Sequence, residues 1–353
     1  MPALDETEPT PLLPLHHFRW DLDKTYLKTE FDTVRDLMKT FVQSADQKRN
    51  VPGARTLLKE LLRVGGGEAE RRLTFISGSP RQMRQVLAQK LELDGVRPDA
   101  FILKPNLSNL LKLRFKAIRS QVGYKLTALL QSRVTERPAE EILFGDDAEM
   151  DAFIYSLYAD LVKRGVTPDS LNRILRASGT AKRHREDILD LYNTVPPDQT
   201  KVRRIFINLD QRSPLARFGK FGSRVVPVFN YFQAAVVLYF EGMLPLSSLV
   251  AVIEAMGPQG YTPARLANSM QDLMRRGVIS DQQIGELEEA FVAFQDHESV
   301  SPYLDAFRRA VRAVDPVFPR LKAIRHSLDY LSLARDARFK QNRMRIPLLN
   351  WLE

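Results

Sequence analysis

The segment FRWDLDKTYLKTEF, residues 18–31, places polar side chains at alternate positions directly behind an aromatic pair. Asp21, Asp23 and Thr25 follow an apolar run that is typical of a buried strand. The three polar groups are therefore predicted to lie at the carboxyl end of that strand. An exposed strand or a turn would carry the same pattern, so the rest of the chain has to decide between the two interpretations.

Strands and helices alternate from this segment to about residue 212. Further strands are indicated by short apolar runs at residues 73–76, 101–103, 142–144 and 202–209. Helical patterns lie between them, at residues 30–48, 52–64, 81–93, 125–133 and 151–165. This alternation predicts a parallel, doubly wound α/β sheet, in which the ligand site lies beyond the carboxyl ends of the strands.

Three parts of the chain are predicted: a flexible leader over 1–16, an α/β domain over 17–212 and a helical C-terminal region over 213–353. No strand is expected after residue 212. Thr167 and Thr262 each precede a proline and are predicted to cap similar helix starts. The most apolar stretch, 225–246, contains polar interruptions and is interpreted as a buried core helix rather than a membrane span.

Composition limits the classes of function. The 353-residue chain has no cysteine, which excludes thiol nucleophiles, disulfides and cysteine-bound metals. Its net charge of +9 is compatible with an anionic partner or with a slightly basic solvated surface. The basic residues are not interleaved with aromatic residues, so nucleic acid is not expected as a partner. The acidic, proline-rich N-terminus lacks the features of a secretory signal, and a cytoplasmic or peripheral membrane location is expected.

Two basic segments have open interpretations. Residues 111–119 and 338–353 would suit an anionic headgroup or a membrane surface, and equally a solvated face or docking onto the body of the protein. The five histidines show no ligand spacing and are not assigned to a metal. Oligomeric state is not indicated by any pattern.

Four loops at the predicted strand ends carry groups suited to phosphoryl transfer. A carboxylate can attack phosphorus, and neighbouring carboxylates can hold Mg²⁺. A lysine and the metal offset the charge on phosphoryl oxygens, whereas hydroxyl and backbone N–H groups bind them. The candidate residues are Asp21, Asp23, Thr25, Ser77, Gly78, Ser79, Lys125, Gly145, Asp146, Asp147 and Asp151.

The order of these residues resembles the haloacid dehalogenase superfamily. Residues 21–25, DLDKT, resemble the superfamily's first motif, D-x-D-x-[TV], and Ser77 resembles the second. Lys125 resembles the third motif, and GDDAEMD, residues 145–151, resembles the fourth, G-D-x-x-x-x-D. One short motif would be weak, but four in order are specific.

A narrower resemblance is to the catalytic domain family of the phosphatidate phosphatase App1. The segments VPGARTLLKELL, SGSPRQ, GDDAEMDAFIY and RRIFI occur in the order found in that family. The resemblance covers roughly residues 16–212. It implies a Mg²⁺-dependent phosphatase that acts on a phosphorylated substrate, with a phospholipid at a membrane surface as one candidate.

The resemblance also implies roles for individual residues. Asp21 would be the nucleophile and a metal ligand, and Asp23 the general acid and base whose backbone carbonyl reaches the metal. Asp146 would be the third metal ligand, supported by Asp147 or Asp151. The remaining roles are phosphoryl binding by Ser77, Gly78 and Lys125 and support of the loop by Thr25.

The chain departs from the family at positions that affect substrate choice more than catalysis. Lys24, Gly78, Arg81 and Asp147 stand where the family has an acid, a serine, a tryptophan and a serine. Three functions therefore stay open. They are a phosphatidate phosphatase, a phosphatase for a soluble phosphometabolite or phosphoprotein, and a lipid-surface or protein-binding module whose motifs are vestigial.

Overall fold

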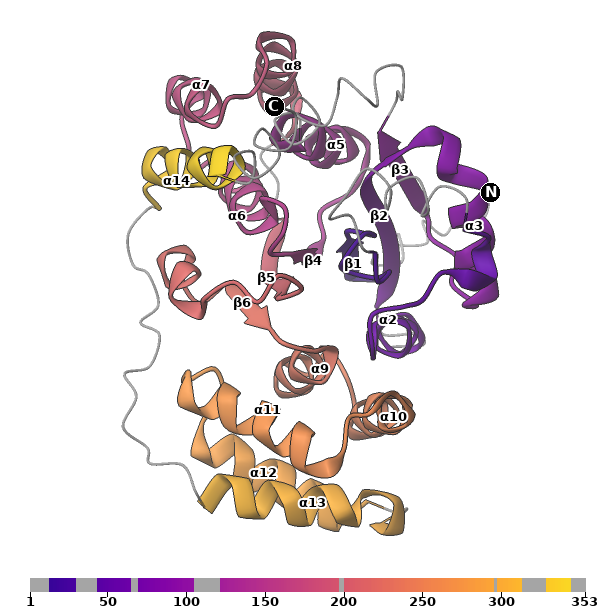
Figure 1. Ribbon diagram of the computed structural model, residues 1–353. Helices are drawn as coiled ribbons and strands as arrows, with labels where there is room; N and C mark the ends of the chain where they lie inside the picture. Colours follow the sequence, from indigo (N-terminus) through magenta and orange to yellow (C-terminus); the bar gives the residue numbers. More distant parts are fainter. Residues whose placement is uncertain are drawn as a thin grey trace, which may run out of the picture.

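The computed structural model describes residues 13–29, 43–64, 69–104, 121–196, 200–294, 297–312 and 328–343. Within this part of the chain, a six-stranded sheet runs in the order β3-β2-β1-β4-β5-β6, and every pairing is parallel. The strands are β1 (Leu15–Trp20), β2 (Glu70–Pro80), β3 (Ala100–Lys104), β4 (Glu140–Asp146), β5 (Lys201–Asn208) and β6 (Val225–Val228). The predicted parallel α/β fold is confirmed (Figure 1).

Helices cover both faces of the sheet, as the apolar strands require. One face packs against α2 (Ala54–Arg63), α3 (Arg84–Leu93), α9 (Tyr231–Phe240) and α10 (Leu246–Met256). The other packs against α5 (Gln121–Thr135), α6 (Asp151–Val162), α7 (Pro168–Ala177), α8 (Lys182–Thr194) and α14 (Tyr330–Arg343). Each face thus has its own apolar core, and the two groups of helices lie on opposite sides of the strands in Figure 1.

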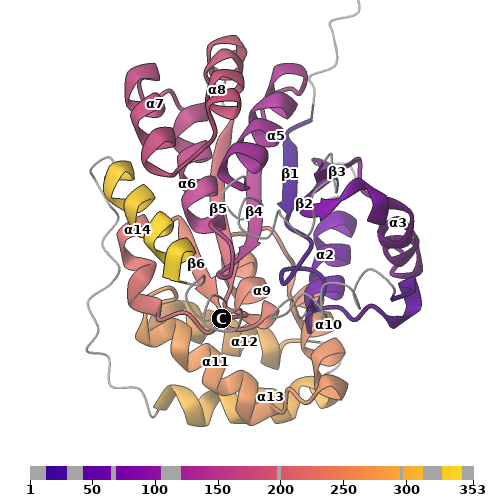
Figure 2. The same cartoon turned by 45° about the horizontal axis from the view of Figure 1, so that its top comes forward.

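The C-terminal half is mainly helical, as predicted. The helices α11 (Pro263–Arg275), α12 (Asp281–Val292) and α13 (His297–Arg312) gather with α10 beyond one end of the sheet (Figure 2). Thr167 and Thr262 accept hydrogen bonds from the backbone N–H groups of Ser170 and Arg265, so both predicted helix caps are confirmed. The apolar helix α9 is buried over most of its length. Among the described residues, no helix is long and apolar enough to cross a membrane.

The structure corrects the prediction that strands end at residue 212. Val225–Val228 form β6, which pairs with β5 at the edge of the same sheet. Pro227 lowers the strand signal of this short run, but proline is tolerated at a sheet edge because no further strand needs its N–H group. The boundary of the α/β domain at residue 212 therefore divides the observed sheet.

Smaller corrections concern where the strands begin and end. Leu15 and His16 belong to β1, so the strand starts inside the predicted leader. Strand β2 continues to Pro80, past the predicted strand end at residue 76, with a shift in its pairing to β3 between Ser77 and Pro80. Gly145 and Asp146 end β4 instead of following it.

Several predictions fall outside the described residues. Most of the helix predicted over 30–48 does, and 45–47 form a short 3₁₀ helix. The basic segment 111–119 and residues 344–353 also lie outside this part of the chain.

Candidate active site at the carboxyl edge of the sheet

The candidate site lies where the strand order reverses. From β1 at the centre, the chain builds β2 and β3 on one side and then crosses to β4 on the other. Such a reversal opens a crevice between the carboxyl ends of the two strands that flank it. Asp21 follows β1 and Asp146 ends β4, and the backbone N–H of Asp21 donates to the carbonyl of Phe144 at 2.9 Å. The order of the strands therefore brings these two aspartates together.

A tight loop after β1 aims the first group of side chains. The backbone N–H groups of Tyr26 and Leu27 both donate to the Leu22 carbonyl, and Lys24 has a positive φ of 59° at the turn. This turn brings the Thr25 hydroxyl back to Asp21, whose Oδ2 accepts its hydrogen bond at 3.2 Å. Asp21 and Thr25 are both buried. The D-x-D-x-T spacing thus places the threonine hydroxyl where it donates a hydrogen bond to the first aspartate.

Groups from distant parts of the chain hold the loop from outside. The Tyr231 hydroxyl of α9 donates to the Thr25 carbonyl at 2.7 Å, and the Asn208 side chain of β5 donates to the Lys24 carbonyl at 2.7 Å. The Tyr231 ring also stacks on Trp20, with ring centroids 5.4 Å apart. A helix from the C-terminal half therefore forms part of the support of the Asp21 loop.

Lys125 extends from α5 into the acidic group. Its ammonium lies 2.8 Å from Asp21 Oδ1, 2.6 Å from Asp151 Oδ1 and 2.6 Å from Glu149 Oε2. The residue does not open the helix as predicted, since α5 already includes Gln121. Its side chain is nonetheless fully buried and aimed at Asp21. The resemblance to the third motif therefore selected a lysine that the fold brings to the nucleophile candidate.

Four carboxylates gather here, and three of them contact the Lys125 ammonium. Asp21, Asp146, Glu149 and Asp151 each offer an oxygen, and these oxygens all lie within 4.8 Å of one another. Glu149 was not assigned a role from the sequence, although it lies inside the GDDAEMD segment. The only available signal was its place in the turn that leads into α6. One ammonium cannot balance four ionised carboxylates, three of them buried and one partly buried, so the group then carries an excess of negative charge.

The pKa directions agree with that excess. Burial raises the pKa of Asp21 well above its usual range, and Glu149, Asp151 and Asp146 add to the rise while Lys125 opposes it. Burial likewise raises the pKa of Asp146, and brings that of Asp151 to about 6. Burial disfavours the charged form of Lys125, but Asp151, Asp21 and Glu149 outweigh it and raise the pKa of the ammonium. Additional positive charge would stabilise the ionised forms of these carboxylates and so lower their pKa values.

Asp146 and Gly145 show how the β4 end is built. Oδ1 of Asp146 accepts from the N–H groups of Ala148 and Glu149, whereas its buried Oδ2 has no hydrogen-bond partner among the described residues. A Cβ atom on Gly145 would lie 2.4 Å from Oδ2 of Asp151, so only glycine lets that carboxylate approach the strand. The G-D-x-x-x-x-D spacing therefore folds its second aspartate back over its glycine.

These residues fit a divalent cation. The unpartnered Oδ2 of Asp146 and the excess of buried carboxylates provide hard oxygen ligands and an electrostatic reason to bind one. Glu149 belongs to this group in place of Asp147. Asp23 contributes no side-chain oxygen to it.

Asp147 points to a different part of the structure. Its two carboxylate oxygens accept from the backbone N–H groups of Gln211 and Ser213, each at 2.8 Å. Asp147 therefore ties the β4 end to the loop after β5. The predicted choice between Asp147 and Asp151 as support for a metal thus favours Asp151.

The serine of the second motif donates a hydrogen bond to Asp23 and not to Asp21. The hydroxyls of Ser77 and Ser79 both donate to Asp23 Oδ2, at 3.1 and 2.6 Å. Burial raises the pKa of Asp23, and the hydrogen bonds from these serines oppose the rise. Gly78 lies between them, where a Cβ atom would be in van der Waals contact with Gln121 and Glu149, each at 3.7 Å. Ser77 thus lies beside Asp23 and Gly78 beside Glu149, and their binding of phosphate stays a prediction.

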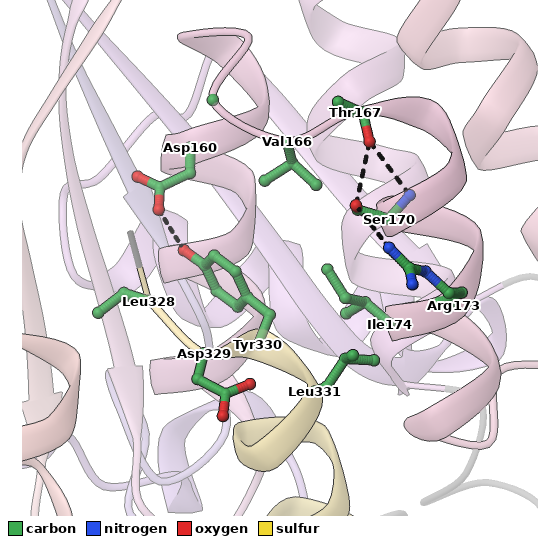
Figure 3. A pocket seen from close by; sticks show the side chains of 11 residues that line it. Asp160, Val166, Thr167, Ser170, Arg173, Ile174, Leu328, Asp329, Tyr330 and Leu331 are labelled. Atoms are coloured by element: carbon green, nitrogen blue, oxygen red, sulfur yellow. Dashed lines mark hydrogen bonds between the residues drawn. The ribbon is translucent and has the colours of Figure 1, made fainter. Parts of the chain in front are cut away.

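A cavity elsewhere in the molecule is separate from this site. It measures about 260 Å³ and lies between the end of α6, α7 and the start of α14, where Tyr330 bonds to Asp160 (Figure 3). Asp151 begins α6 and Asp160 lies near its end, which corresponds to about 14 Å along the helix. The cavity therefore opens far from the carboxylates.

The fold and the site define an α/β protein whose acidic, metal-compatible group of side chains lies at the switch point of a parallel sheet. Residues 20–175 match the family described as "Phosphatidate phosphatase APP1, catalytic domain". This match confirms the resemblance indicated by the motifs, and it implies phosphatase chemistry. Searches among curated proteins and solved structures found no match. The matched segment ends within α7, before β5, β6 and the C-terminal helices.

Proposed function

We propose that this chain is a Mg²⁺-dependent phosphatase that hydrolyses a phosphomonoester through an aspartyl-phosphate on Asp21. One observation carries the proposal. The Asp21 carboxylate lies at the switch point of the sheet, held by Lys125 and Thr25 within a buried acidic group that fits a cation. The match of residues 20–175 to a phosphatase family supports the same chemistry.

In the first half of the reaction, a carboxylate oxygen of Asp21 attacks the phosphorus atom and the bond to the leaving oxygen breaks. Asp23 gives its proton to that oxygen, so the product leaves as an alcohol. Lys125 offsets charge on the phosphoryl oxygens, and Ser77 and the backbone at Gly78 bind them. Thr25 keeps Asp21 in place through its hydrogen bond to Oδ2.

In the second half, Asp23 takes a proton from water, and the water oxygen attacks the phosphorus atom of the aspartyl-phosphate. Inorganic phosphate leaves and the Asp21 carboxylate is restored. The raised pKa of Asp23, caused by burial, favours a residue that both gives and takes a proton.

Side-chain oxygens of Asp21, Asp146, Asp151 and Glu149 and the backbone carbonyl of Asp23 would hold the metal. Bound Mg²⁺ supplies positive charge that stabilises the phosphoryl oxygens in the transition state. Its presence would also balance the carboxylates that Lys125 leaves uncompensated.

The substrate class that we propose is phosphatidate, and the description of the matched family supports it. Two further cations suit an anionic ester. Lys48 interacts electrostatically with Asp23 and Lys104 with Glu149, and burial lowers the pKa of each lysine while these carboxylates oppose the change. Besides Lys125, these two lysines would therefore favour the binding of a phosphate dianion.

The test is release of phosphate from a small aryl phosphate, with and without Mg²⁺, by the parent and by Asp21→Asn. Asparagine keeps the shape but is a poor nucleophile and a weaker metal ligand. Asp169→Asn, in the first turn of α7, is the matched control and should keep the parent rate. We expect Mg²⁺-dependent turnover that disappears only in Asp21→Asn.

Phosphatidate in detergent micelles and a soluble alkyl phosphate then separate the substrate classes. Faster turnover of phosphatidate would support the lipid substrate, and faster turnover of the soluble ester would favour a phosphometabolite. No turnover of the aryl phosphate, the alkyl phosphate or phosphatidate by the parent would contradict the catalytic proposal and favour a binding module.

A further inference from the structure

We propose that Ser79 is a positioning residue that holds the general acid and base, Asp23, during catalysis. The inference rests on the proposed function, because it assigns Asp23 that role. The Ser79 hydroxyl donates to Asp23 Oδ2 at 2.6 Å, which is shorter than the 3.1 Å bond from Ser77 to the same oxygen. Ser77 and Ser79 are 0% and 6% exposed, so water does not readily replace either donor.

The backbone of β2 presents both hydroxyls to the same carboxylate. Residues two apart in a strand face the same side, and the pairing of β2 with β3 shifts between Ser77 and Pro80. Irregular strand ends of this kind re-aim side chains beside active sites. Gly78 lies between the serines on the side of Glu149 and Gln121. The irregular end of β2 therefore directs the Ser79 side chain toward Asp23.

The two serines have different tasks once a phosphoryl group binds. The Ser77 hydroxyl has one proton, and in this structure that proton goes to Asp23. If Ser77 turns its proton to a phosphoryl oxygen, its bond to Asp23 is lost. The backbone N–H of Ser79 donates to Ser77 Oγ at 2.9 Å, which fixes the Ser77 oxygen while its proton changes partner. Ser79 then remains as the hydroxyl donor that keeps Asp23 in place.

The chemistry needs the Asp23 oxygen to which neither serine donates. Both serine hydrogen bonds fall on Oδ2, and neither serine contacts Oδ1. The terminal torsion of an aspartate is broad, so a carboxyl group without a fixed oxygen samples many orientations. Holding Oδ2 leaves Oδ1 to carry the proton toward the leaving oxygen at a defined orientation.

The experiment compares two esters whose leaving groups differ in their need for a proton. The leaving group of 4-nitrophenyl phosphate departs readily as an anion, whereas that of a soluble alkyl phosphate must be protonated. We measure kcat/KM, which reports the steps up to transfer of the phosphoryl group to Asp21. For Ser79→Ala we expect a loss of roughly 10- to 100-fold on the alkyl ester and of less than about 3-fold on the aryl ester, because general acid catalysis contributes 10²–10⁴-fold.

Three variants make the test specific. Ser79→Cys keeps nearly the same volume but has a weak donor, so it should show the same imbalance even if Ser79→Ala does not fold. Ser79→Thr keeps the hydroxyl and should restore the parent ratio between the two esters. Ser178→Ala removes another buried hydroxyl, which bonds to Leu175 and Thr180 at the end of α7, and should not change the ratio.

The outcomes separate this inference from the proposed function. An equal loss on both esters in Ser79→Ala or Ser79→Cys would show a merely structural role and overturn the inference, with the phosphatase intact. A parent that turns over neither ester, nor phosphatidate in micelles, would overturn the proposed function and the inference together.

Discussion

At the scale of single residues, Asp151 can approach the end of β4 because Gly145 has no side chain. Asp151 Oδ2 accepts from the Asp146 N–H at 3.2 Å, and Gly145 leaves the space through which it does so. The same aspartate bonds to Lys125 through Oδ1. One glycine therefore sets the positions of two members of the acidic group relative to the lysine.

Gly145→Ala should displace Asp151 and lower both stability and activity. The added Cβ would lie 2.4 Å from Oδ2 and 2.5 Å from Cβ of Asp151, which is far inside normal contact. Overpacking of this kind costs about 1–3 kcal/mol of unfolding free energy. Denaturant titration and phosphate release measure the two effects. Gly219→Ala is the control, because nothing lies within 4 Å of a Cβ atom there. Unchanged stability of Gly145→Ala would contradict the packing argument.

At the scale of elements, a buried polar network joins β1, β2 and β4 behind the site. His17 of β1 bonds to Thr74 of β2 at 2.8 Å, and Arg19 bonds to Glu141 of β4 at 2.9 Å. Burial, followed by the charges of Arg19 and Arg133, lowers the pKa of His17 to about 2. The imidazole is therefore neutral in the folded protein at any pH at which the protein would be handled.

This network predicts a loss of stability in mild acid. The pKa of His17 is about 2 when folded and about 6.5 when unfolded, so the unfolded chain binds an extra proton between those values. The contribution of His17 is complete above pH 6.5 and is lost as the pH falls below it, by about 1 kcal/mol between pH 6 and pH 5.

Urea titrations of the parent and His17→Asn at those two pH values test this expectation. Between pH 6 and pH 5, the free energy of unfolding should fall less in the variant than in the parent. His184→Asn is the comparison: burial also lowers the pKa of His184, but its side chain is 34% exposed, so this variant should change the pH dependence less than His17→Asn does. Identical pH dependence in the parent and His17→Asn would refute the assignment.

At the scale of the whole molecule, the C-terminal half completes the domain that holds the site. Strand β6 pairs with β5, and α9 packs on the face that contains Trp20 and Phe144. The stack of Trp20 on Phe144, with centroids 3.9 Å apart, continues to Tyr231. The active-site loop and α9 therefore share one apolar core.

A chain that ends after residue 212 should not fold cooperatively. It would lack β6 and α9 and leave the aromatic rings of that core exposed to water. A chain that ends after residue 312 keeps both elements and loses α14, so it should melt cooperatively at a lower temperature than the parent. Thermal melting followed by circular dichroism compares the two. A cooperative transition in the shorter chain would show that residues 17–212 form an independent domain.

Mg²⁺ should stabilise the whole molecule through the acidic group. A ligand at 100 times its Kd adds about 2.7 kcal/mol, so the melting temperature should rise by roughly a few degrees. Asp146→Asn should lose most of this rise, because it replaces the buried, unpartnered Oδ2 with a neutral group. Asp169→Asn should keep the rise in full. An equal response of the parent and Asp146→Asn would argue against a cation at this site.

The amino-acid sequence by itself determined the alternation of strands and helices, the motifs at the strand ends and thus the parallel sheet. These follow from local periodicity and from short spacings such as D-x-D-x-T, which report burial and chemistry along the chain. Asp21, Thr25, Ser77, Lys125 and Asp146 could be chosen in this way.

Only the tertiary structure decided which side chains meet. The sequence pattern did not reveal that Glu149 joins the acidic group, that Asp147 turns away to the loop after β5, or that Ser79 bonds to Asp23. Nor did it reveal β6, whose short proline-containing run is a strand because β5 offers an open edge. Spacing along the chain cannot supply these results, because side-chain direction at a strand end depends on backbone torsions and on neighbours from distant segments.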